Sequence, residues 1–256
     1  MILVLRKMRH ALLADNRLGK YLLYAFGEIV LVIIGILVAL YINDLSDARK
    51  ERVRELAYLQ NIRTDLGLNI AEMDRYLASR AGKIASAQRI LEHFNGKPVT
   101  DYAAFNADGV EIYSWKKFYL VNNTFQELVN SGQLAKIGNP RIKNQLLDIE
   151  ALYTQMKSEE DHFRYDTEKL IYEPIYSFMD LQPLVASYEY RVTGGASGLD
   201  AILRPEAFDA YFKSVMLKNG FTMTILEFQT MNAQMQELKA KCQDLVAIID
   251  EDIKAG

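Results

Sequence analysis

One acidic side chain, Glu28, lies inside an otherwise apolar run of 22 residues that extends from Tyr21 to Ile42. About 20 apolar residues in a helix span the ~30 Å hydrocarbon core of a bilayer, so the run predicts a transmembrane helix. A carboxylate inside such a helix is energetically unfavourable and by default marks a functional position. Glu28 is therefore the first candidate for chemistry in this chain.

Helical spacing places Glu28 on the same face as two small residues. At 100° per residue, Gly35 and Ala39 fall within about 20° of Glu28, and Tyr21 and Tyr24 flank them on that side. Two small residues four positions apart let helix backbones approach closely. This face predicts either contact with a second copy of the helix, or a ring of carboxylates that binds protons or cations. In a third interpretation Glu28 is neutral and reaches toward the headgroups.

A second group with metal-ligand spacing is Glu159-x-x-His162, which places a carboxylate and an imidazole one helical turn apart. Carboxylate-bridged di-iron bundles need a second such pair and two further glutamates on facing helices. Neither His10 nor His93 supplies that pair, since Ile90 and not a glutamate stands three positions before His93. We therefore expect a solvated face without a metal, formed by Glu159, Glu160, Asp161, His162 and Asp166.

The sequence lacks the motifs of nucleophilic and nucleotide chemistry. It contains no G-x-S-x-G, no Walker sequence and no G-x-G-x-x-G after a predicted strand. We expect the glycine-rich residues 194–198 to form a flexible loop. We expect no catalytic residue and no cofactor. One aromatic cluster could line a ligand pocket, although core packing is the favoured interpretation. Its members are Tyr172, Tyr176, Phe178, Tyr188 and Tyr190.

A long amphipathic helix is predicted from about Asp47 to Asn95. Its apolar stripe advances by a mean of 3.5 residues per step from Leu56 to Leu91, which is the period of coiled coils. The stripe predicts packing against a second copy of the chain or against another helix of the same domain. Its packing residues are Leu59, Leu66, Met73, Leu77, Ile84 and Leu91.

The segment after this helix is the least regular part of the sequence. Residues 110–121 are rich in β-branched and aromatic side chains, which favours a short strand or a packed loop. Thr124 and Glu127 have the spacing of a capping box, which predicts a short helix ending at Gly132.

The remaining sequence predicts a mostly α fold. Asn139-Pro140 is typical of a helix start, and this helix should reach about Tyr172 before it kinks or ends at Pro174. Pro205 opens a helix that should end at Asn219-Gly220. A last helix is expected over residues 221–252.

Charge separates two parts of the sequence. Residues 1–20 contain five basic side chains and one acidic one, whereas the part after the apolar run has 25 basic and 31 acidic side chains, a net charge of −6. An acidic domain of this kind does not favour nucleic acid as a partner. The basic flank predicts that the N-terminus stays in the cytoplasm while the larger part is exported. Residues 2–13 fit either an interfacial helix or a simple basic flank.

An uncleaved anchor is favoured over a signal peptide, because the apolar run is long and has no small-x-small cleavage site at its end. The single cysteine, Cys242, cannot form an intramolecular disulfide and should be a small buried side chain. We expect four regions. They are a basic amphipathic cytoplasmic segment (1–19), a transmembrane helix (20–43), an amphipathic stalk helix (44–95) and a helical extracytoplasmic domain (96–256) that packs with residues 50–95.

The run from Lys20 to Leu40, KYLLYAFGEIVLVIIGILVAL, resembles the N-terminal signature of an uncharacterised family of bacterial single-pass membrane proteins. A second similar stretch runs from Thr124 to Ile137. The chain departs from the family pattern over residues 41–47, which lack the expected tryptophan. The resemblance implies a protein of the bacterial inner membrane and implies no activity.

These features predict a non-enzymatic membrane protein that forms a homo-oligomeric scaffold through the Glu28 face and the stalk stripe. One alternative is a channel or a proton- or ion-coupled subunit that uses Glu28. Another is a periplasmic helical bundle that senses a ligand. Membrane lipid and a second copy of the chain are the expected partners, and another membrane or periplasmic protein is a further one.

Overall fold

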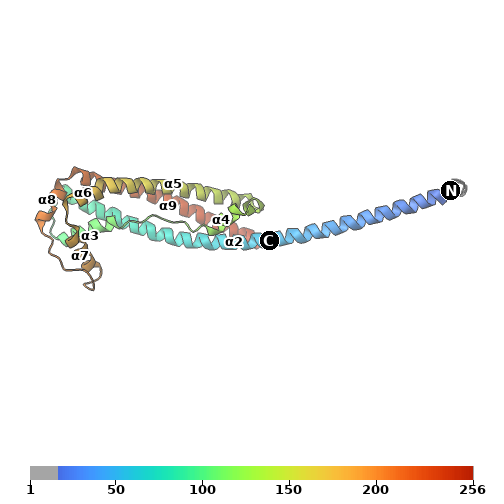
Figure 1. The fold of residues 1–256 in the computed structure, drawn as a ribbon, viewed down its shortest axis with the longest axis horizontal. Coiled ribbons are helices and arrows are strands. Elements are labelled where there is room, and N and C mark those ends of the chain that lie inside the picture. The colour runs from blue at the N-terminus through green and yellow to red at the C-terminus, as the bar shows by residue number, and fades with distance from the viewer. Residues whose placement is uncertain (1–16, 256) are drawn as a thin grey trace, which may run out of the picture. The chain divides into compact units, whose positions relative to one another are not determined.

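The computed structural model describes residues 17–255, and over this range it is helical and contains no strand (Figure 1). The mostly α fold class is therefore confirmed. The chain divides into two compact units, Met1–Ala57 (unit 1) and Tyr58–Gly256 (unit 2). The predicted amphipathic segment 1–19 lies almost entirely outside the described residues.

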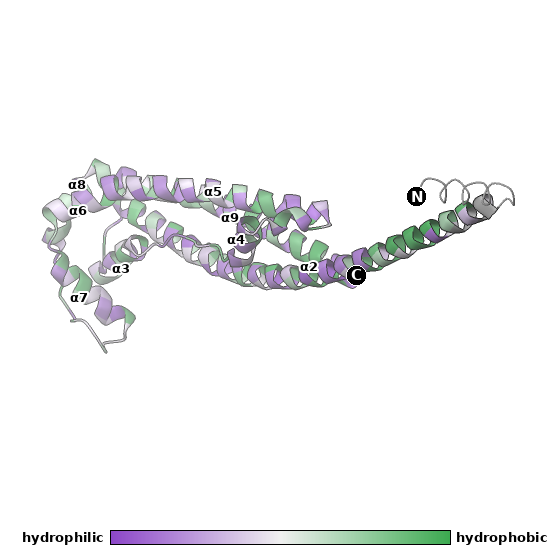
Figure 2. Ribbon diagram, turned by 45° about the vertical axis from the view of Figure 1, so that its right-hand side comes forward, coloured by the Kyte–Doolittle hydropathy of each residue, from purple (hydrophilic) through white to green (hydrophobic). Residues whose placement is uncertain are grey.

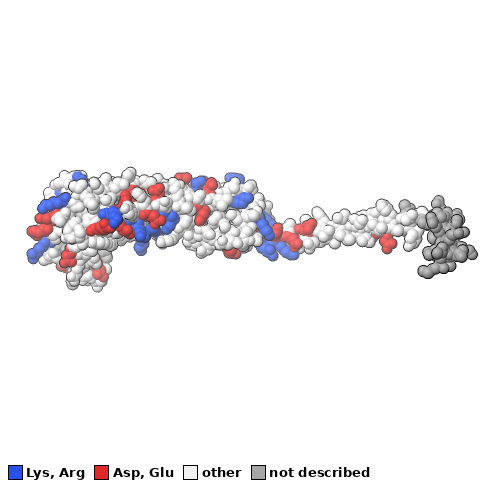
Figure 3. Space-filling view, turned by 45° about the horizontal axis from the view of Figure 1, so that its top comes forward, with Lys and Arg blue, Asp and Glu red and all other residues white. Residues whose placement is uncertain are grey.

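Unit 1 contains the first part of helix α2 (Arg17–Phe94). Its most apolar 18-residue window has a mean hydropathy of 2.6, and no part of that window is buried. Figure 2 shows hydrophobic residues along this part of α2, and Figure 3 shows it almost free of charged side chains. By length and composition, α2 is the one helix in the described part of the chain that is able to cross a membrane.

Three long helices form the main body of unit 2: the part of α2 from Tyr58 onward, α5 (Pro140–Thr167) and α9 (Val215–Ala255). α2 and α9 are antiparallel. In the polar contacts between them, the residue number in α9 falls by as much as the residue number in α2 rises. These contacts are Arg63–Asp250, Asp74–Lys239 and Asn95–Lys218.

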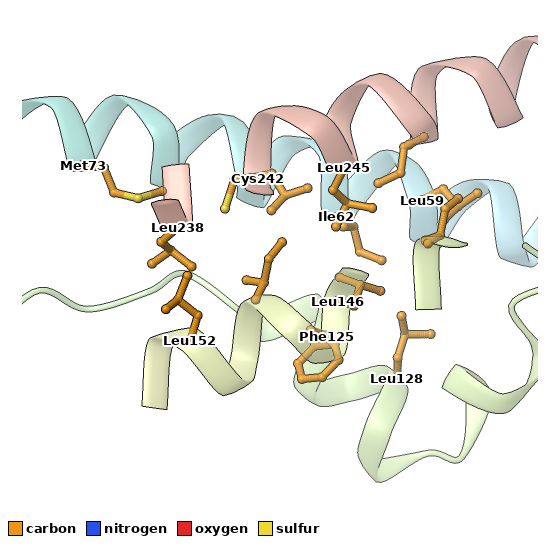
Figure 4. Close-up of a cluster of buried hydrophobic side chains, with 14 of the residues drawn as sticks. Leu59, Ile62, Met73, Phe125, Leu128, Leu146, Leu152, Leu238, Cys242 and Leu245 are labelled. Carbon is orange, nitrogen blue, oxygen red and sulfur yellow. The ribbon is translucent and has the colours of Figure 1, made fainter. Parts of the chain in front are cut away.

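The core of this body is apolar, with side chains from α2, α4 (Asn123–Asn130), α5 and α9 pointing toward one another (Figure 4). The predicted stripe on α2 faces this core and two adjoining clusters, so it packs against helices of the same chain. Its buried or partly buried residues are Leu59, Leu66, Met73, Leu77, Ile84 and Leu91. Cys242 is fully buried as predicted, and burial raises the pKa of its thiol to about 12.

α5 begins as predicted, since the Asn139 side chain accepts a hydrogen bond from the backbone N–H of Arg141 at 3.0 Å. At its end the helix widens into a π-helical turn, η2 (Glu168–Tyr172), and α6 (Glu173–Phe178) follows. Pro174 explains this change, because proline has no backbone N–H and its ring crowds the preceding turn.

α9 is longer than predicted, because it begins at Val215 and passes through Gly220, where the sequence predicted the end of one helix and the start of the next. A Cβ atom at Gly220 would lie 2.6 Å from Cγ1 of Ile171 and 3.0 Å from Cβ of Leu170, both in η2. Glycine is therefore required here by the close approach of two helices and does not mark a helix end.

A second core lies at one end of unit 2, where α3 (Tyr102–Tyr113), α7 (Leu181–Val192), η3 (Pro205–Phe208) and α8 (Asp209–Lys213) gather. The rings of Phe105, Phe208 and Tyr211 contact one another edge to face. The helix predicted from Pro205 is present as η3 and α8, which end at Lys213, short of the predicted end at Asn219-Gly220.

The predicted strand is not present in residues 110–121. α3 extends to Tyr113, and residues 115–122 form an irregular segment in which Phe118 is fully buried. The packed-loop alternative is therefore right for residues 115–121 and wrong for residues 110–113, which belong to α3. The capping box is also wrong, because the Thr124 hydroxyl donates to the carboxylate of Asp65 on α2 at 2.7 Å. α4 begins one residue earlier, ends at Asn130 and is followed by η1 (Gln133–Lys136).

Candidate functional site

The face of α2 that carries Glu28 is uncovered in unit 1. The side chains of Tyr21, Glu28 and Ala39 are exposed, and a Cβ atom at Gly35 would have no atom within 4 Å. The side chain of Tyr24 lies outside the described residues. Within the described part of the chain, Glu28 makes no hydrogen bond or ion pair. The face thus presents one carboxyl group next to a surface of small residues.

A buried ion pair joins α2 to α5 in unit 2. Nη2 of Arg80 lies 2.5 Å from Oε1 of Glu160, and the two side chains are 3% and 0% exposed. Both oxygens of Glu160 also accept from the backbone N–H of Phe118, at 3.0 and 3.3 Å. Burial lowers the pKa of Arg80 and raises the pKa of Glu160, while their mutual attraction opposes both shifts. The predicted solvated position of Glu160 is wrong, because these two partners satisfy its carboxylate inside the core.

Two further polar side chains of α2 hold the irregular segment 115–122. Asn69 accepts a hydrogen bond from the N–H of Val121 and donates one to its carbonyl, both at 2.8 Å. The Tyr76 hydroxyl donates to the carbonyl of Lys117 at 2.7 Å. Side chains, and not a neighbouring strand, therefore satisfy backbone groups of this segment.

A cavity of about 420 Å³ lies beside Arg80, between α2 and the end of α3. The buried Lys83 projects from α2 at its wall and donates to the backbone carbonyl of Glu111 at 2.6 Å and to its carboxylate at 3.0 Å. The charged side chains on the wall are Glu72, Arg75, Arg80, Lys83, Glu111 and Lys116. We call this space the polar cavity.

A smaller, apolar cavity of about 160 Å³ lies in the second core and is lined mainly by apolar side chains of α3, η2, α7 and α8. The aromatic cluster proposed from the sequence contributes only Tyr176, whose hydroxyl contacts that of Tyr113 at the wall. Tyr172 and Phe178 are partly buried against the second core, and Tyr190 is exposed. Core packing therefore accounts for part of the cluster.

The spacing pair Glu159-x-x-His162 does not by itself form a site. His162 instead lies near Asp166 and Glu227, with possible ligand atoms of all three within 4.8 Å of one another. Both carboxyl oxygens of Glu227 are buried and have no hydrogen-bond donor among the described residues. Burial, followed by the adjacent Asp166 carboxylate, raises the pKa of Glu227 to about 7. This arrangement favours a proton on Glu227 near neutral pH.

Residues 28–157, about half of the chain, match a family of unknown function, DUF6090. The chain belongs to this family. The prediction that the chain belongs to an uncharacterised family is thus confirmed. The DUF6090 range begins at Glu28, includes Arg80, and ends shortly before Glu160. A search of curated proteins and a search of solved structures each found no match to the chain.

Sequence reasoning missed the polar core residues of the DUF6090 range, although a signal for them was present. The hydrophobic stripe passes from Leu66 to Ile70, which is partly buried, and so skips Asn69. Strict alternation of three and four residues instead predicts core positions at Leu59, Ile62, Leu66, Asn69, Met73, Tyr76, Arg80, Lys83, Ala87 and Ile90. The structure buries all of these, Tyr76 only partly.

Proposed function

We propose that this chain is a non-enzymatic, single-pass membrane protein that assembles with a second copy of itself through the Glu28 face of α2. The observation that carries the proposal is the exposed Glu28 carboxyl, without a partner in the described chain, in the otherwise apolar part of α2 from Tyr21 to Ile42. Lipid tails offer no hydrogen bond to this group, and an acidic side chain at the centre of a span costs about 2.5–3.5 kcal/mol.

A second copy of the same face supplies what lipid lacks. Two carboxyl groups, at least one of them protonated, can hydrogen-bond across a helix pair, which contributes on the order of 1 kcal/mol. Gly35 and Ala39 let the two backbones approach, and the space around Gly35 is open. The face therefore combines a polar group that needs a partner with a surface that allows close contact.

The stalk stripe is not part of this proposed interface. Leu59, Leu66 and Met73 are buried against α5 and α9 of the same chain, so contact with another copy would require opening unit 2. The basic N-terminal segment supports a cytoplasmic N-terminus and an extracytoplasmic unit 2. The membrane that α2 crosses in this proposal is the inner membrane of a bacterium. Lipid and a second copy remain the proposed partners.

The test is the mass of the full chain in nanodiscs or mild detergent, compared across variants. Gly35→Leu should shift the particle toward monomer, because the larger side chain separates the backbones. Gly27→Leu is the matched control: it makes the same change about 80° away from Gly35 around the helix, where space is also open, and should leave the oligomer intact. Glu28→Gln should retain the oligomer, since an amide also forms hydrogen bonds.

A wild-type particle that stays monomeric at all protein-to-lipid ratios would contradict the proposal. Equal effects of Gly27→Leu and Gly35→Leu would show that the small-residue face has no special role. The alternative of ion or proton transfer predicts a flux across vesicles that Glu28→Gln abolishes. Flux in the wild type, without any effect of Gly35→Leu on mass, would favour that alternative.

A further inference from the structure

We propose that the polar cavity of unit 2 binds a small organic anion, through the free Nη1 of buried Arg80 together with Lys116. This inference concerns unit 2 alone and does not depend on self-association in the membrane. It rests on four observations: an unpartnered guanidinium nitrogen, the balance of charge on the wall, the aromatic lining and the volume.

Arg80 is only partly satisfied by the protein. Its Nη2 bonds to Glu160, while Nη1 is buried and has no hydrogen-bond partner among the described residues. The whole residue is 2% exposed and lies on the wall of the polar cavity. A buried donor on a charged group is unfavourable when it lacks an acceptor. An anionic oxygen in the cavity would supply that acceptor.

The charges on the wall leave a basic excess for a ligand. Of the two acidic side chains, Glu72 pairs with Arg75 and Glu111 with Lys83. Glu160 lies behind Arg80 and is occupied by it and by the N–H of Phe118. Lys116 is exposed and makes no ion pair within the described part of the chain. An anion entering the cavity therefore meets Lys116 and the guanidinium of Arg80, while Glu72 and Glu111 on the wall are already paired with Arg75 and Lys83.

The rest of the lining suits an organic body and not a bare inorganic ion. Tyr76, Trp115 and Phe228 give the wall aromatic surface, and Ser79 and Ser114 add hydroxyl groups. A volume of about 420 Å³ is many times the ~30 Å³ share of one water in the liquid. It lies within the range of pockets that bind small molecules. A carboxylate attached to an aromatic ring fits both parts of this wall.

Trp115 provides a direct readout, because it is the single tryptophan of the chain and lies at the cavity. The full chain in nanodiscs is titrated with benzoate, with neutral benzamide and with inorganic phosphate, and tryptophan fluorescence and thermal unfolding are followed. Benzoate should give a saturable fluorescence change and raise the unfolding temperature. Benzamide and phosphate should each bind at least tenfold more weakly, since one lacks the charge and the other the ring.

Variants assign the effect to the cavity. Lys116→Gln should weaken benzoate binding several-fold, whereas Lys254→Gln, a matched change of an exposed lysine in α9 away from the cavity, should not. Arg80→Lys keeps a cation for Glu160 but removes the guanidinium fork, and should reduce binding at least tenfold. If Arg80→Lys does not fold, the two lysine variants still decide the question.

Three results would overturn the proposal. The first is the absence of any saturable response to benzoate. The second is equal binding of benzoate and benzamide, which would mean that the cavity takes an apolar ring and does not select charge. The third is an equal effect of Lys116→Gln and Lys254→Gln. A fourth result, phosphate binding as tight as that of benzoate, would overturn the proposal that the ligand is organic, and only recognition of an anion would remain.

Discussion

At the scale of single residues, the Arg80–Glu160 pair couples three segments of unit 2: α2, α5 and the irregular segment through Phe118. A buried ion pair contributes little net stability relative to an apolar pair, but it is unfavourable to leave one member alone. Its position among apolar core residues therefore fixes which part of α2 lies beside which part of α5.

We expect Arg80→Met to destabilise the protein by about 3–5 kcal/mol, because Glu160 would remain buried with only the Phe118 N–H as a partner. Arg63→Met is the control: it breaks an ion pair with Asp250 whose side chains are 52% and 36% exposed, and should cost less than about 1 kcal/mol. Denaturant unfolding followed by helical circular dichroism measures both. Similar losses for the two variants would mean that burial does not govern the pair.

Glu227 should make stability depend on pH. Its pKa is raised from an ordinary value near 4.5 to about 7, so the folded state keeps a proton that the unfolded state loses. This contribution is fully present below pH 4.5 and is lost as the pH rises to about 7. Glu227→Gln should therefore be more stable than the wild type at pH 8, by about 1 kcal/mol after allowance for solvent screening, and equally stable at pH 4.

The control for this prediction is Glu237→Gln, an exposed glutamate on the same helix. Because Glu237 is exposed, this substitution should change stability by less than about 0.5 kcal/mol. A Glu227→Gln variant that loses stability at pH 8 would indicate instead that the ionised carboxylate has a partner there.

The sequence was least informative about the roles of individual residues. Hydrophobicity identified Leu59, Leu66 and Met73 as core residues, and it passed over Arg80 because a charged side chain is normally exposed. Only the partners, Glu160 and the Phe118 N–H, make burial of Arg80 tolerable, and they come from distant parts of the chain. Local spacing carries no information about such partners.

At the scale of elements, two glycines within helices differ in the space around them. Gly220 in α9 lies against η2, with atoms of Ile171 and Leu170 too near for a Cβ, whereas a Cβ at Gly109 in α3 would have no atom within 4 Å. Helix propensity alone favours alanine over glycine at both positions by about 1 kcal/mol. Packing therefore decides whether each substitution to alanine stabilises or destabilises the protein.

We expect Gly220→Ala to destabilise by about 1–3 kcal/mol, because α9 and η2 must separate to admit the methyl group. Gly109→Ala should stabilise by up to about 1 kcal/mol through helix propensity. Thermal and denaturant unfolding of the two variants in parallel measures this contrast. Stabilisation by Gly220→Ala would show that the close approach at η2 is not maintained in solution.

Elements with a local cause were predictable, and those with a distant cause were not. Asn139-Pro140 starts α5 because the cap and the fixed proline φ act within one turn. The capping box at Thr124 failed because Asp65, far along the chain, takes its hydroxyl. The β-rich composition of residues 110–121 reflects burial of Phe118 in a loop, with Asn69 taking the place of a neighbouring strand.

At the scale of the whole molecule, the fold class and the apolar helix followed from periodicity and length, which need no tertiary information. The direction of packing did not, since a stripe at 3.5 spacing fits another chain as well as it fits α5 and α9. The structure places the stripe inside unit 2. This makes unit 2 a body with its own core.

Residues 58–256 alone should therefore be helical and monomeric in water, without detergent. Size-exclusion chromatography with light scattering and circular dichroism test this expectation, with the full chain in detergent as the comparison. A soluble oligomer that dissociates when Leu66→Ala is introduced would contradict it, because the stripe would then be shared between copies.

The antiparallel register of α2 and α9 also has a mechanical consequence. Arg63 lies beside Asp250, so the chain enters and leaves unit 2 at the same end. Tension applied between these two ends would load the polar contacts between α2 and α9 one after another, starting at Arg63 and Asp250. Each contact would then resist separately, so the force needed should be lower than if all three resisted together.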